Sequence, residues 1–253
     1  MAERYFWPNP NSESQVPAAQ IAELSGDEAR HLIRVMRQKS GDVVTLFDGH
    51  GCEYRAEITN TRKDRVELRI FETRRVDTES QRQVTIAVSL PKGDRQKWLV
   101  EKLTELGCRC LIPLWTERGV VQPTVQVIER LRRQVIEATK QCNRSELMQI
   151  SPVQTVVECV SGYVSGVAND GKMVGWIAHP HSDGEFGQHD LASVMQTALP
   201  KNVLVLIGPE GGFTHQEVEQ AVTLGLQPLD LGPRILRVET AAMVLTAILS
   251  ARV

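Results

Sequence analysis

Residues 203–212 read VLVLIGPEGG, in which five consecutive apolar residues run directly into a glycine-rich turn. An unbroken apolar run of this kind is typical of a parallel strand that is buried on both faces of its sheet. Thr214 and Glu217 follow at the spacing of a capping box, which predicts that a helix begins directly after the turn. In open α/β sheets, ligands bind beyond the carboxyl ends of such strands, where glycine lets the backbone approach them. The stretch therefore indicates an α/β domain with a ligand site at residues 208–212.

The composition of this turn narrows the class of ligand. It contains neither the Gly-x-Gly-x-x-Gly of a dinucleotide site nor the Gly-Lys-Ser/Thr of a triphosphate site. We therefore expect a cofactor that is held mainly by backbone and apolar contacts. On the glycines alone, a tight turn that only needs their backbone freedom is an equal alternative.

A second turn, within LDLGPRILRVET at residues 229–240, also follows a short apolar run. Arg234 and Arg237 lie beside its Gly-Pro pair and lead into an alanine-rich helix, an arrangement that suits an anion site. An equal alternative is that the two arginines cap neighbouring helices.

Outward from these turns, strand and helix patterns alternate, which predicts a mostly parallel sheet covered by helices. Strands are expected at residues 84–90, 108–114, 173–178 and 203–207, and helices at 94–106, 125–142, 191–199, 214–224 and 238–250. The first part of the chain differs, because one helix at 27–37 and three alternating strands at 43–47, 52–58 and 65–71 predict a small β-barrel. We place a barrel domain at residues 1–73, a charged linker at 74–82 and the α/β domain at 83–253.

Several classes of protein are not expected from the composition. No apolar run approaches the roughly 18 residues of a membrane span, and the N-terminus lacks the features of a secretory signal, so we expect a cytoplasmic protein. The five cysteines are odd in number and form no Cys-x-x-Cys pair, which argues against a disulfide framework and a zinc site. The polar loop His179-Pro180-His181, with Asp183, Glu185 and His189, matches no standard zinc spacing, and we expect no metal. Residues 162–166 do not form the Gly-x-Ser-x-Gly elbow of a serine hydrolase.

Charge is unevenly distributed along the chain. Residues 1–144 hold 24 Lys and Arg against 20 Asp and Glu, a net charge of +4, whereas residues 145–253 hold 5 against 11, a net charge of −6. Basic clusters lie at residues 62–75, 92–102 and 130–144. Such clusters suit a nucleic-acid backbone, but solvated faces of helices and strands give the same pattern.

Four segments together resemble the RsmE family of SPOUT-class methyltransferases: LIGPEGGFT, LGPRILRVETA, LPKGDRQKWLVEKLTELG and HLIRVMRQKSGDVVTLFDG. Members of this family methylate N3 of a uridine in the decoding region of 16S ribosomal RNA. The resemblance implies an N-terminal PUA-like RNA-binding barrel, a C-terminal α/β domain with a deep trefoil knot, S-adenosyl-L-methionine as cofactor and a homodimer formed through the C-terminal domain. One departure is Val238, where the family usually has threonine.

The resemblance also implies roles for individual residues. The cofactor is expected to contact Ala178, His179, Pro180, Ile207, Gly208, Pro209, Glu210, Gly211, Gly212, Leu231, Gly232, Ile235, Leu236 and Arg237. Arg237 and Arg234 are expected to act in catalysis, with Glu239 as the candidate base. RNA contacts are expected from Arg4, His31, Arg34, Arg37, Lys92, Arg95, Gln141 and Arg144. The alternatives are a methyltransferase of the same class that acts on another RNA position, and a non-catalytic RNA-binding protein with this fold.

Overall fold

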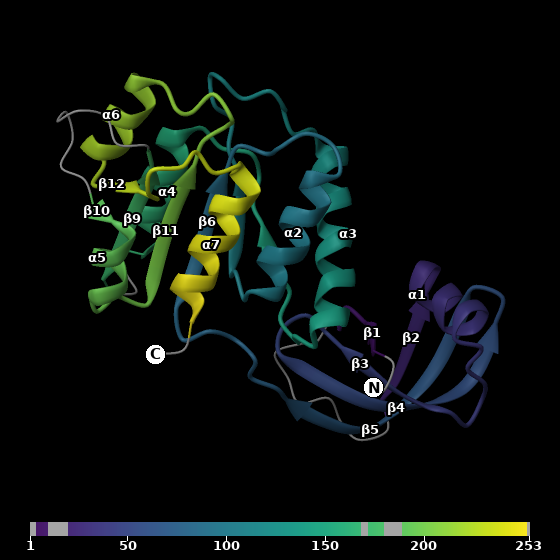
Figure 1. Ribbon diagram of the computed structural model, residues 1–253. Coiled ribbons are helices and arrows are strands. Elements are labelled where there is room, and N and C mark those ends of the chain that lie inside the picture. Colours follow the sequence, from purple (N-terminus) through teal and green to yellow (C-terminus); the bar gives the residue numbers. More distant parts are fainter. Residues whose placement is uncertain (1–3, 10–19, 168–171, 180–188, 252–253) are drawn as a thin grey trace. The chain divides into compact units, whose positions relative to one another are not determined.

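The computed structural model describes residues 4–9, 20–167, 172–179 and 189–251 (Figure 1). The chain divides into two compact units. Unit 1 is drawn from residues 1–79 and 139–147, and unit 2 from residues 80–138 and 148–253. Each unit has a sheet and a hydrophobic core of its own.

Unit 1 is built on a curled five-stranded sheet in the order β1-β3-β4-β5-β2 (Figure 1). Its strands are β1 (Arg4–Phe6), β2 (Ile21–Ser25), β3 (Val43–Phe47), β4 (Cys52–Arg62) and β5 (Arg65–Arg75). The last four pair antiparallel, and β1 pairs parallel to β3. Val66, Leu68 and Ile70 alternate into the core, which confirms the strand pattern predicted there. The short strands β1 and β2 were not anticipated.

The helix expected at residues 27–37 is shorter and less regular than the sequence suggested. A single α-helical turn, α1 (Gly26–Arg30), continues into a π-helical segment, η1 (His31–Val35). Both Ala29 and Leu32 are fully buried, so the apolar spacing does describe the buried face. The helix ends before Gly41, because Arg37 adopts a φ of 55°, a left-handed conformation in which the helix cannot continue.

Unit 2 contains a seven-stranded sheet in the order β10-β12-β9-β11-β6-β7-β8, in which every recorded pairing is parallel. The strands are β6 (Gln83–Val88), β7 (Cys110–Pro113), β8 (Gln149–Ile150), β9 (Met173–Ala178), β10 (His189–Asp190), β11 (Asn202–Ile207) and β12 (Gln227–Asp230). β11 lies between β6 and β9, and each of its residues is buried. The prediction that the run at 203–207 forms a central parallel strand is therefore confirmed.

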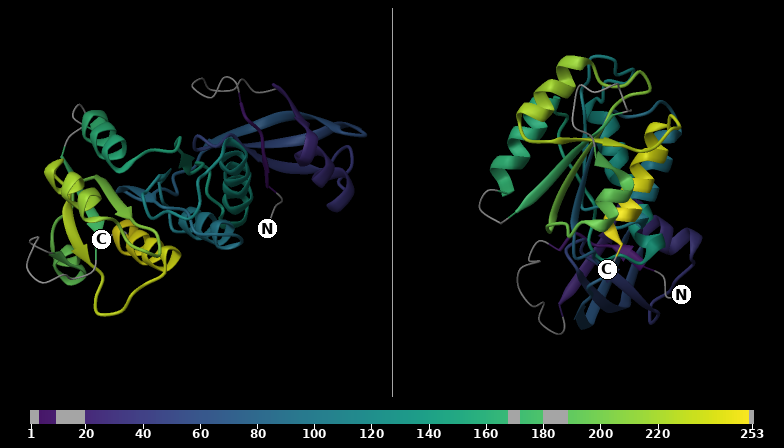
Figure 2. Two further views of the ribbon diagram at one scale, coloured as in Figure 1. Left: turned by 90° about the horizontal axis from the view of Figure 1, so that it is seen from above. Right: turned by 60° about the vertical axis from the view of Figure 1, so that its left-hand side comes forward.

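Helices cover both faces of this sheet (Figure 2). They are α2 (Arg95–Glu105), α3 (Val125–Cys142), α4 (Val156–Val167), α5 (Leu191–Gln196), α6 (His215–Thr223) and α7 (Val238–Ser250). α4 and α6 pack in one apolar cluster with β11, whereas α2 and α7 pack against each other on the opposite face.

α4 was not predicted, because its valines and glycines have low intrinsic helix propensity. The segment at residues 162–166, rejected as a hydrolase elbow, lies within this helix. None of the described helices combines the length and apolarity that a bilayer crossing requires.

Candidate active site

Three strand ends meet at one edge of the sheet in unit 2. Ala178 at the end of β9 pairs with Ile207 of β11 and with Leu229 of β12, and the His179 N–H donates to the Leu229 carbonyl at 3.0 Å. A cavity of about 440 Å³ opens beyond these ends, which is within the range of roughly 300–1,000 Å³ typical of small-molecule sites. Its lining comprises Ala178, His179, residues 207–213, residues 229–236, Val238 and Ala241.

The cavity brings together the residues that were expected to contact a cofactor. All of them line it except Arg237 and Pro180, the second of which lies outside the described residues, as do His181, Asp183 and Glu185. Sequence reasoning missed six lining residues: Phe213, Leu229, Asp230, Pro233, Val238 and Ala241. Four of them adjoin a predicted residue, namely Phe213, Asp230, Pro233 and Val238, while Leu229 lies two positions before Leu231 and Ala241 lies one helical turn beyond Val238. Their closeness in sequence to the predicted residues was therefore the signal that could have identified them.

The turn at residues 208–212, here called the glycine turn, has a backbone that needs glycine. The Gly212 N–H donates to the Pro209 carbonyl at 2.8 Å, and Gly212 has a φ of +70°. A Cβ at Gly208 would lie 3.0 Å from the Phe213 ring, so a larger residue would force the turn to shift. In the described part of the chain, the N–H groups of Glu210 and Gly211 have no acceptor. The glycine turn therefore offers two backbone N–H groups that could donate hydrogen bonds to a ligand.

The capping box predicted after the turn is present. The Thr214 hydroxyl accepts from the Glu217 N–H at 3.3 Å, and Glu217 Oε2 accepts from the Thr214 N–H at 2.8 Å. These two bonds satisfy N–H groups at the start of α6. They fix the end of the glycine turn to a helix.

The second turn, at residues 230–237, contributes residues 230–236 to the lining of the cavity. Gly232 has a φ of +102°, and its N–H donates to Asp230 Oδ1 at 2.9 Å. Ile235 is 94% exposed, and no ion pair is recorded for Arg234 or Arg237 within the described residues. Both arginines are exposed, so their charge is available to a ligand or substrate.

Two carboxylates share one arginine: Glu210 lines the cavity, whereas Glu239 lies next to the lining residue Val238 and is not itself part of the lining. Arg95 Nη2 lies 3.0 Å from Glu210 Oε1, and Arg95 Nη1 lies 3.7 Å from Glu239 Oε1. Glu239 is in the first turn of α7 and is only 6% exposed. Its Oε2 is buried and has no hydrogen-bond partner in the described structure. Arg95 therefore links α2, the glycine turn and α7 around an unsatisfied carboxylate oxygen.

His179 contributes a neutral ring to the same cavity. Burial, followed by the charge of His215, lowers the pKa of His179 below its ordinary value of 6.5. The ring is therefore uncharged at neutral pH. Its Nδ1 is buried and has no partner among the described residues, which leaves one polar atom for a ligand.

Comparison with known proteins connects this geometry with a family. Residues 78–250 match the model of an RNA methyltransferase domain, and residues 24–71 match that of an RNA methyltransferase PUA domain. The chain is 31% identical over 238 residues to ribosomal RNA small subunit methyltransferase E of Bacillus subtilis, covering 92% of this chain and 90% of the relative. The corresponding enzyme of Synechocystis is 32% identical over 228 residues, covering 90% and 72%.

The chain belongs to the ribosomal RNA small subunit methyltransferase E family. Two solved structures share its fold over almost the whole length. A methyltransferase from Legionella pneumophila, solved with bound SAM, superposes with a TM-score of 0.82 at 29% identity, covering 98% of this chain and 97% of that one. Methyltransferase E of Neisseria gonorrhoeae, bound to S-adenosyl methionine, gives 0.80 at 27% identity, covering 98% and 96%. The family and the α/β plus PUA fold class implied by the sequence are thus confirmed.

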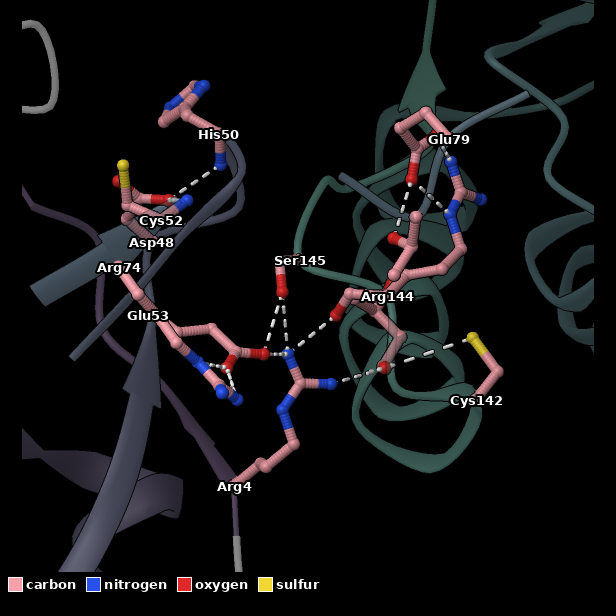
Figure 3. A network of polar contacts seen from close by, with 12 residues as sticks. Arg4, Asp48, His50, Cys52, Glu53, Arg74, Glu79, Cys142, Arg144 and Ser145 are labelled. Atoms are coloured by element: carbon pink, nitrogen blue, oxygen red, sulfur yellow. Dashed lines mark hydrogen bonds and ion pairs between the residues drawn. The ribbon is translucent and has the colours of Figure 1, made fainter. Parts of the chain in front are cut away.

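In this member of the methyltransferase E family, two of the arginines expected to contact RNA lie inside a network in unit 1 (Figure 3). Arg4 Nη2 lies 2.7 Å from Glu53 Oε1 and donates to the Arg144 carbonyl at 2.8 Å. Arg144 Nε donates to Glu79 Oε1 at 3.0 Å. The Arg4 and Arg144 side chains are 8% and 5% exposed. Contact of these two arginines with RNA stays a prediction. In the structure, their side chains bind carboxylates and a backbone carbonyl of unit 1.

The other residues expected to bind RNA are placed differently. Arg34, Arg37, Lys92 and Gln141 are exposed, and no ion pair is recorded for them in the described chain. The Nδ1 of His31 is buried without a partner there. By contrast, the basic cluster at 62–75 faces carboxylates across the strands. The recorded pairs on β2, β4 and β5 are Arg55–Glu72, Arg62–Glu67, Arg65–Glu23, Arg69–Glu57 and Arg74–Glu53.

Proposed function

We propose that the protein transfers a methyl group from S-adenosyl-L-methionine to N3 of a uridine in 16S rRNA of the small ribosomal subunit. The observation that carries the proposal is the cavity where β9, β11 and β12 end, lined by a glycine-turn backbone in a member of the methyltransferase E family. Relatives of the same fold were solved with this cofactor.

The residues present fit such a cofactor. Apolar lining from Ile207, Leu231 and Leu236 suits an adenosine group, and the free N–H groups of the glycine turn suit its polar atoms. Asp230 supplies negative charge for a cationic ligand, whereas the charge of Glu210 is shared with Arg95. When bound, the cofactor supplies an activated methyl group; the chain's own task is to hold it and to orient the base.

The uracil must lose its N3 proton, because N3 is protonated at neutral pH. We propose Glu239 as the group that accepts this proton, since its Oε2 is buried and unpartnered among the described residues. Arg237 and Arg234 then stabilise negative charge on the uracil oxygens or hold phosphates. The competing interpretation is that Glu239, paired with Arg95, is a first-turn carboxylate favoured by the dipole of α7.

A Glu239→Gln variant separates these two roles. If Glu239 is the base, the rate of methyl transfer falls by at least about 10²-fold, the usual contribution of general-base catalysis, while cofactor affinity is retained. Full methylation by a folded Glu239→Gln protein would remove Glu239 from this role.

RNA binding is proposed to use the cations for which no ion pair is recorded among the described residues. Replacing Arg34 and Arg37 together by alanine should weaken RNA binding and reduce the slope of log affinity against log salt, because fewer counterions are released. The matched control replaces Arg55 and Arg69, which lie in unit 1 but already face Glu72 and Glu57. An equal loss of slope in both double variants would contradict the assignment.

We also propose the assembly that the family implies, a homodimer formed through the C-terminal domain. Ile235, which is 94% exposed, and the exposed Ala247 of α7 are apolar surface that such a contact would cover. Sedimentation velocity of the wild type and of Ile235→Asp tests this, with a shift from dimer to monomer expected. The deep trefoil knot stays a prediction, as do the domain limits 1–73 and 83–253 with the linker 74–82, which limited proteolysis can probe.

The proposed reaction has a direct test. Small subunits from cells lacking this gene are incubated with the protein and methyl-labelled S-adenosyl-L-methionine, and the modified nucleotide is mapped by mass spectrometry. We expect one 3-methyluridine in 16S rRNA. A methyl group elsewhere would point to another RNA position, and RNA binding without any transfer would point to a non-catalytic protein.

A further inference from the structure

Another turn of unit 2 supports the glycine turn from outside the cavity. It comprises Thr116–Gly119, follows β7 and is here called the 116–119 turn. The Gly119 N–H donates to the Thr116 carbonyl at 3.0 Å. A Cβ at Gly119 would lie only 2.7 Å from Thr116 Oγ1, so the turn closes this tightly only with glycine there. The 116–119 turn is therefore a compact unit that presents the two residues at its centre, Glu117 and Arg118.

The base of the 116–119 turn is anchored to the strands that lead to the cavity. Thr116 is buried, and its hydroxyl donates to Ser89 Oγ at 3.2 Å. The Ser89 N–H in turn donates at 3.0 Å to the carbonyl of Ile207, the last residue before the glycine turn. The two turns thus share one rigid support.

Arg118 contacts the glycine turn directly. Its Nη1 donates to the Gly211 carbonyl at 3.0 Å, and its aliphatic carbons lie 3.6 Å from the position of a Gly211 Cβ. The carbonyl of Gly211 and the N–H of Gly212 belong to one planar peptide and point in opposite directions. Because that N–H closes the glycine turn on Pro209, a donor that fixes the Gly211 carbonyl also fixes the turn.

A second contact joins the 116–119 turn to α6. The Glu117 N–H donates to Glu217 Oε1 at 3.0 Å, while Glu217 Oε2 accepts from Thr214 in the capping box. One carboxylate therefore connects the 116–119 turn with the helix that begins where the glycine turn ends. The glycine turn is held at its middle by Arg118 and at its end by Glu217.

We propose that Arg118 is a positioning residue for the cofactor, acting through the Gly211 carbonyl to keep the glycine turn in its binding conformation. The inference rests on the proposed function, since S-adenosyl-L-methionine is the ligand assigned to the cavity. A turn that is already ordered loses less conformational entropy on binding, and a charged donor holds a carbonyl more firmly than a neutral one. Arg118 itself does not line the cavity.

Arg118→Met tests the proposal, because methionine keeps part of the apolar stem and removes the donor. Titration calorimetry with S-adenosyl-L-methionine should show a Kd raised about three- to ten-fold, the range of an ordinary hydrogen bond, because Arg118 is exposed and water screens its charge. KM for the cofactor should rise to match, with kcat at saturation unchanged. The matched control is Arg133→Met, at an exposed residue of α3 with no recorded partner in the described chain, and its Kd should equal that of the wild type.

A second variant reaches the same contact without touching Arg118. Gly119→Ala should raise the Kd in the same direction, because the added Cβ displaces the 116–119 turn. A wild-type Kd and KM in Arg118→Met would overturn the inference, and so would a lowered Tm with unchanged affinity, which is the mark of a purely structural residue. Failure of the wild type itself to bind the cofactor would instead overturn the proposed function.

Discussion

The cavity of unit 2 and the charged network of unit 1 are stabilised in different ways. The glycine turn that lines the cavity is made of residues close in sequence, such as Gly208 and Gly212, whose conformations are fixed by local geometry. The network joins Arg4 to Glu53 and Ser145, which lie 49 and 141 residues further along the chain, and Glu53 and Ser145 are themselves 92 residues apart. The conformation of the glycine turn can therefore be predicted from the local sequence. The charged network of unit 1 depends on pairing between residues that are distant in the sequence, so it can be recognised only in the structure.

Removing the carboxylate at the centre of the network should have the largest effect. Glu53→Ala leaves the buried Arg4 guanidinium without its counterion, and breaking a buried pair in this way costs about 3–5 kcal/mol. Chemical denaturation of the protein should show this loss. Arg69→Ala, which breaks the exposed pair with Glu57, is the control and should cost less than about 1 kcal/mol. Equal losses would mean that the network does not differ from the surface pairs.

The difference between the regions also explains what the sequence could predict. β11, the glycine turn and the Thr214–Glu217 capping box each have a local pattern, and all three were predicted correctly. β1 was missed because three residues carry no period, and its partner β3 lies some 40 residues along the chain. α4 was missed although Thr155 and Glu158 have capping-box spacing and form those bonds, because its valines argue for strand.

The expected RNA contacts show the same limit. The family resemblance selected Arg4, Arg95 and Arg144 together with Arg34 and Arg37, but a resemblance cannot show which charges already have partners. Carboxylates that are distant in sequence neutralise the first three in the structure. The lining of the cavity was predictable, by contrast, because its residues follow strand ends that a parallel sheet must bring together.

A second prediction compares two glycines of the turn. Gly208→Ala places a Cβ 3.0 Å from the Phe213 ring and should weaken binding of S-adenosyl-L-methionine by about ten-fold or more, because overpacking of this kind costs roughly 1–3 kcal/mol. Gly211→Ala meets only the Arg118 side chain, at 3.6 Å, an ordinary contact, and should change the affinity less than about three-fold. Calorimetry of both variants checks this, and a reversed order would contradict the assigned geometry.

A third prediction uses the two capping boxes of unit 2. Thr214→Ala and Thr155→Ala should each cost about 1 kcal/mol of stability, because each removes one helix cap. Only Thr214→Ala should also weaken cofactor binding, since only α6 begins where the glycine turn ends. Measurement of both denaturation and cofactor affinity separates the effects; weaker binding in both variants would show that stability alone limits affinity.

The smallest effects should appear in the dependence of stability on pH. The pKa of Glu53 would be raised by burial, but hydrogen bonds from Arg74 and Ser145 and the charge of Arg4 hold it below its ordinary value of 4.5. Its contribution is therefore complete above pH 4.5 and is lost as the pH falls further. The pKa of His179 is lower in the folded protein than its ordinary value of 6.5, so the unfolded chain takes up this proton at a higher pH. Stability should therefore begin to decline as the pH falls below 6.5.

Two variants test whether Glu53 and His179 cause these two declines in stability. Glu53→Gln should flatten the decline at the lower pH, and His179→Gln should flatten the one that begins near 6.5. Urea denaturation as a function of pH measures both. An unchanged profile in either variant would show that another group titrates in that window.

Titration calorimetry with S-adenosyl-L-methionine, applied to the wild type, Gly208→Ala and Glu53→Gln, tests the central claim that the cofactor is held by the backbone where β9, β11 and β12 end. We predict one site per chain in the wild type, weaker binding in Gly208→Ala and unchanged affinity in Glu53→Gln. Absence of binding in the folded wild type, or full affinity in Gly208→Ala, would contradict it.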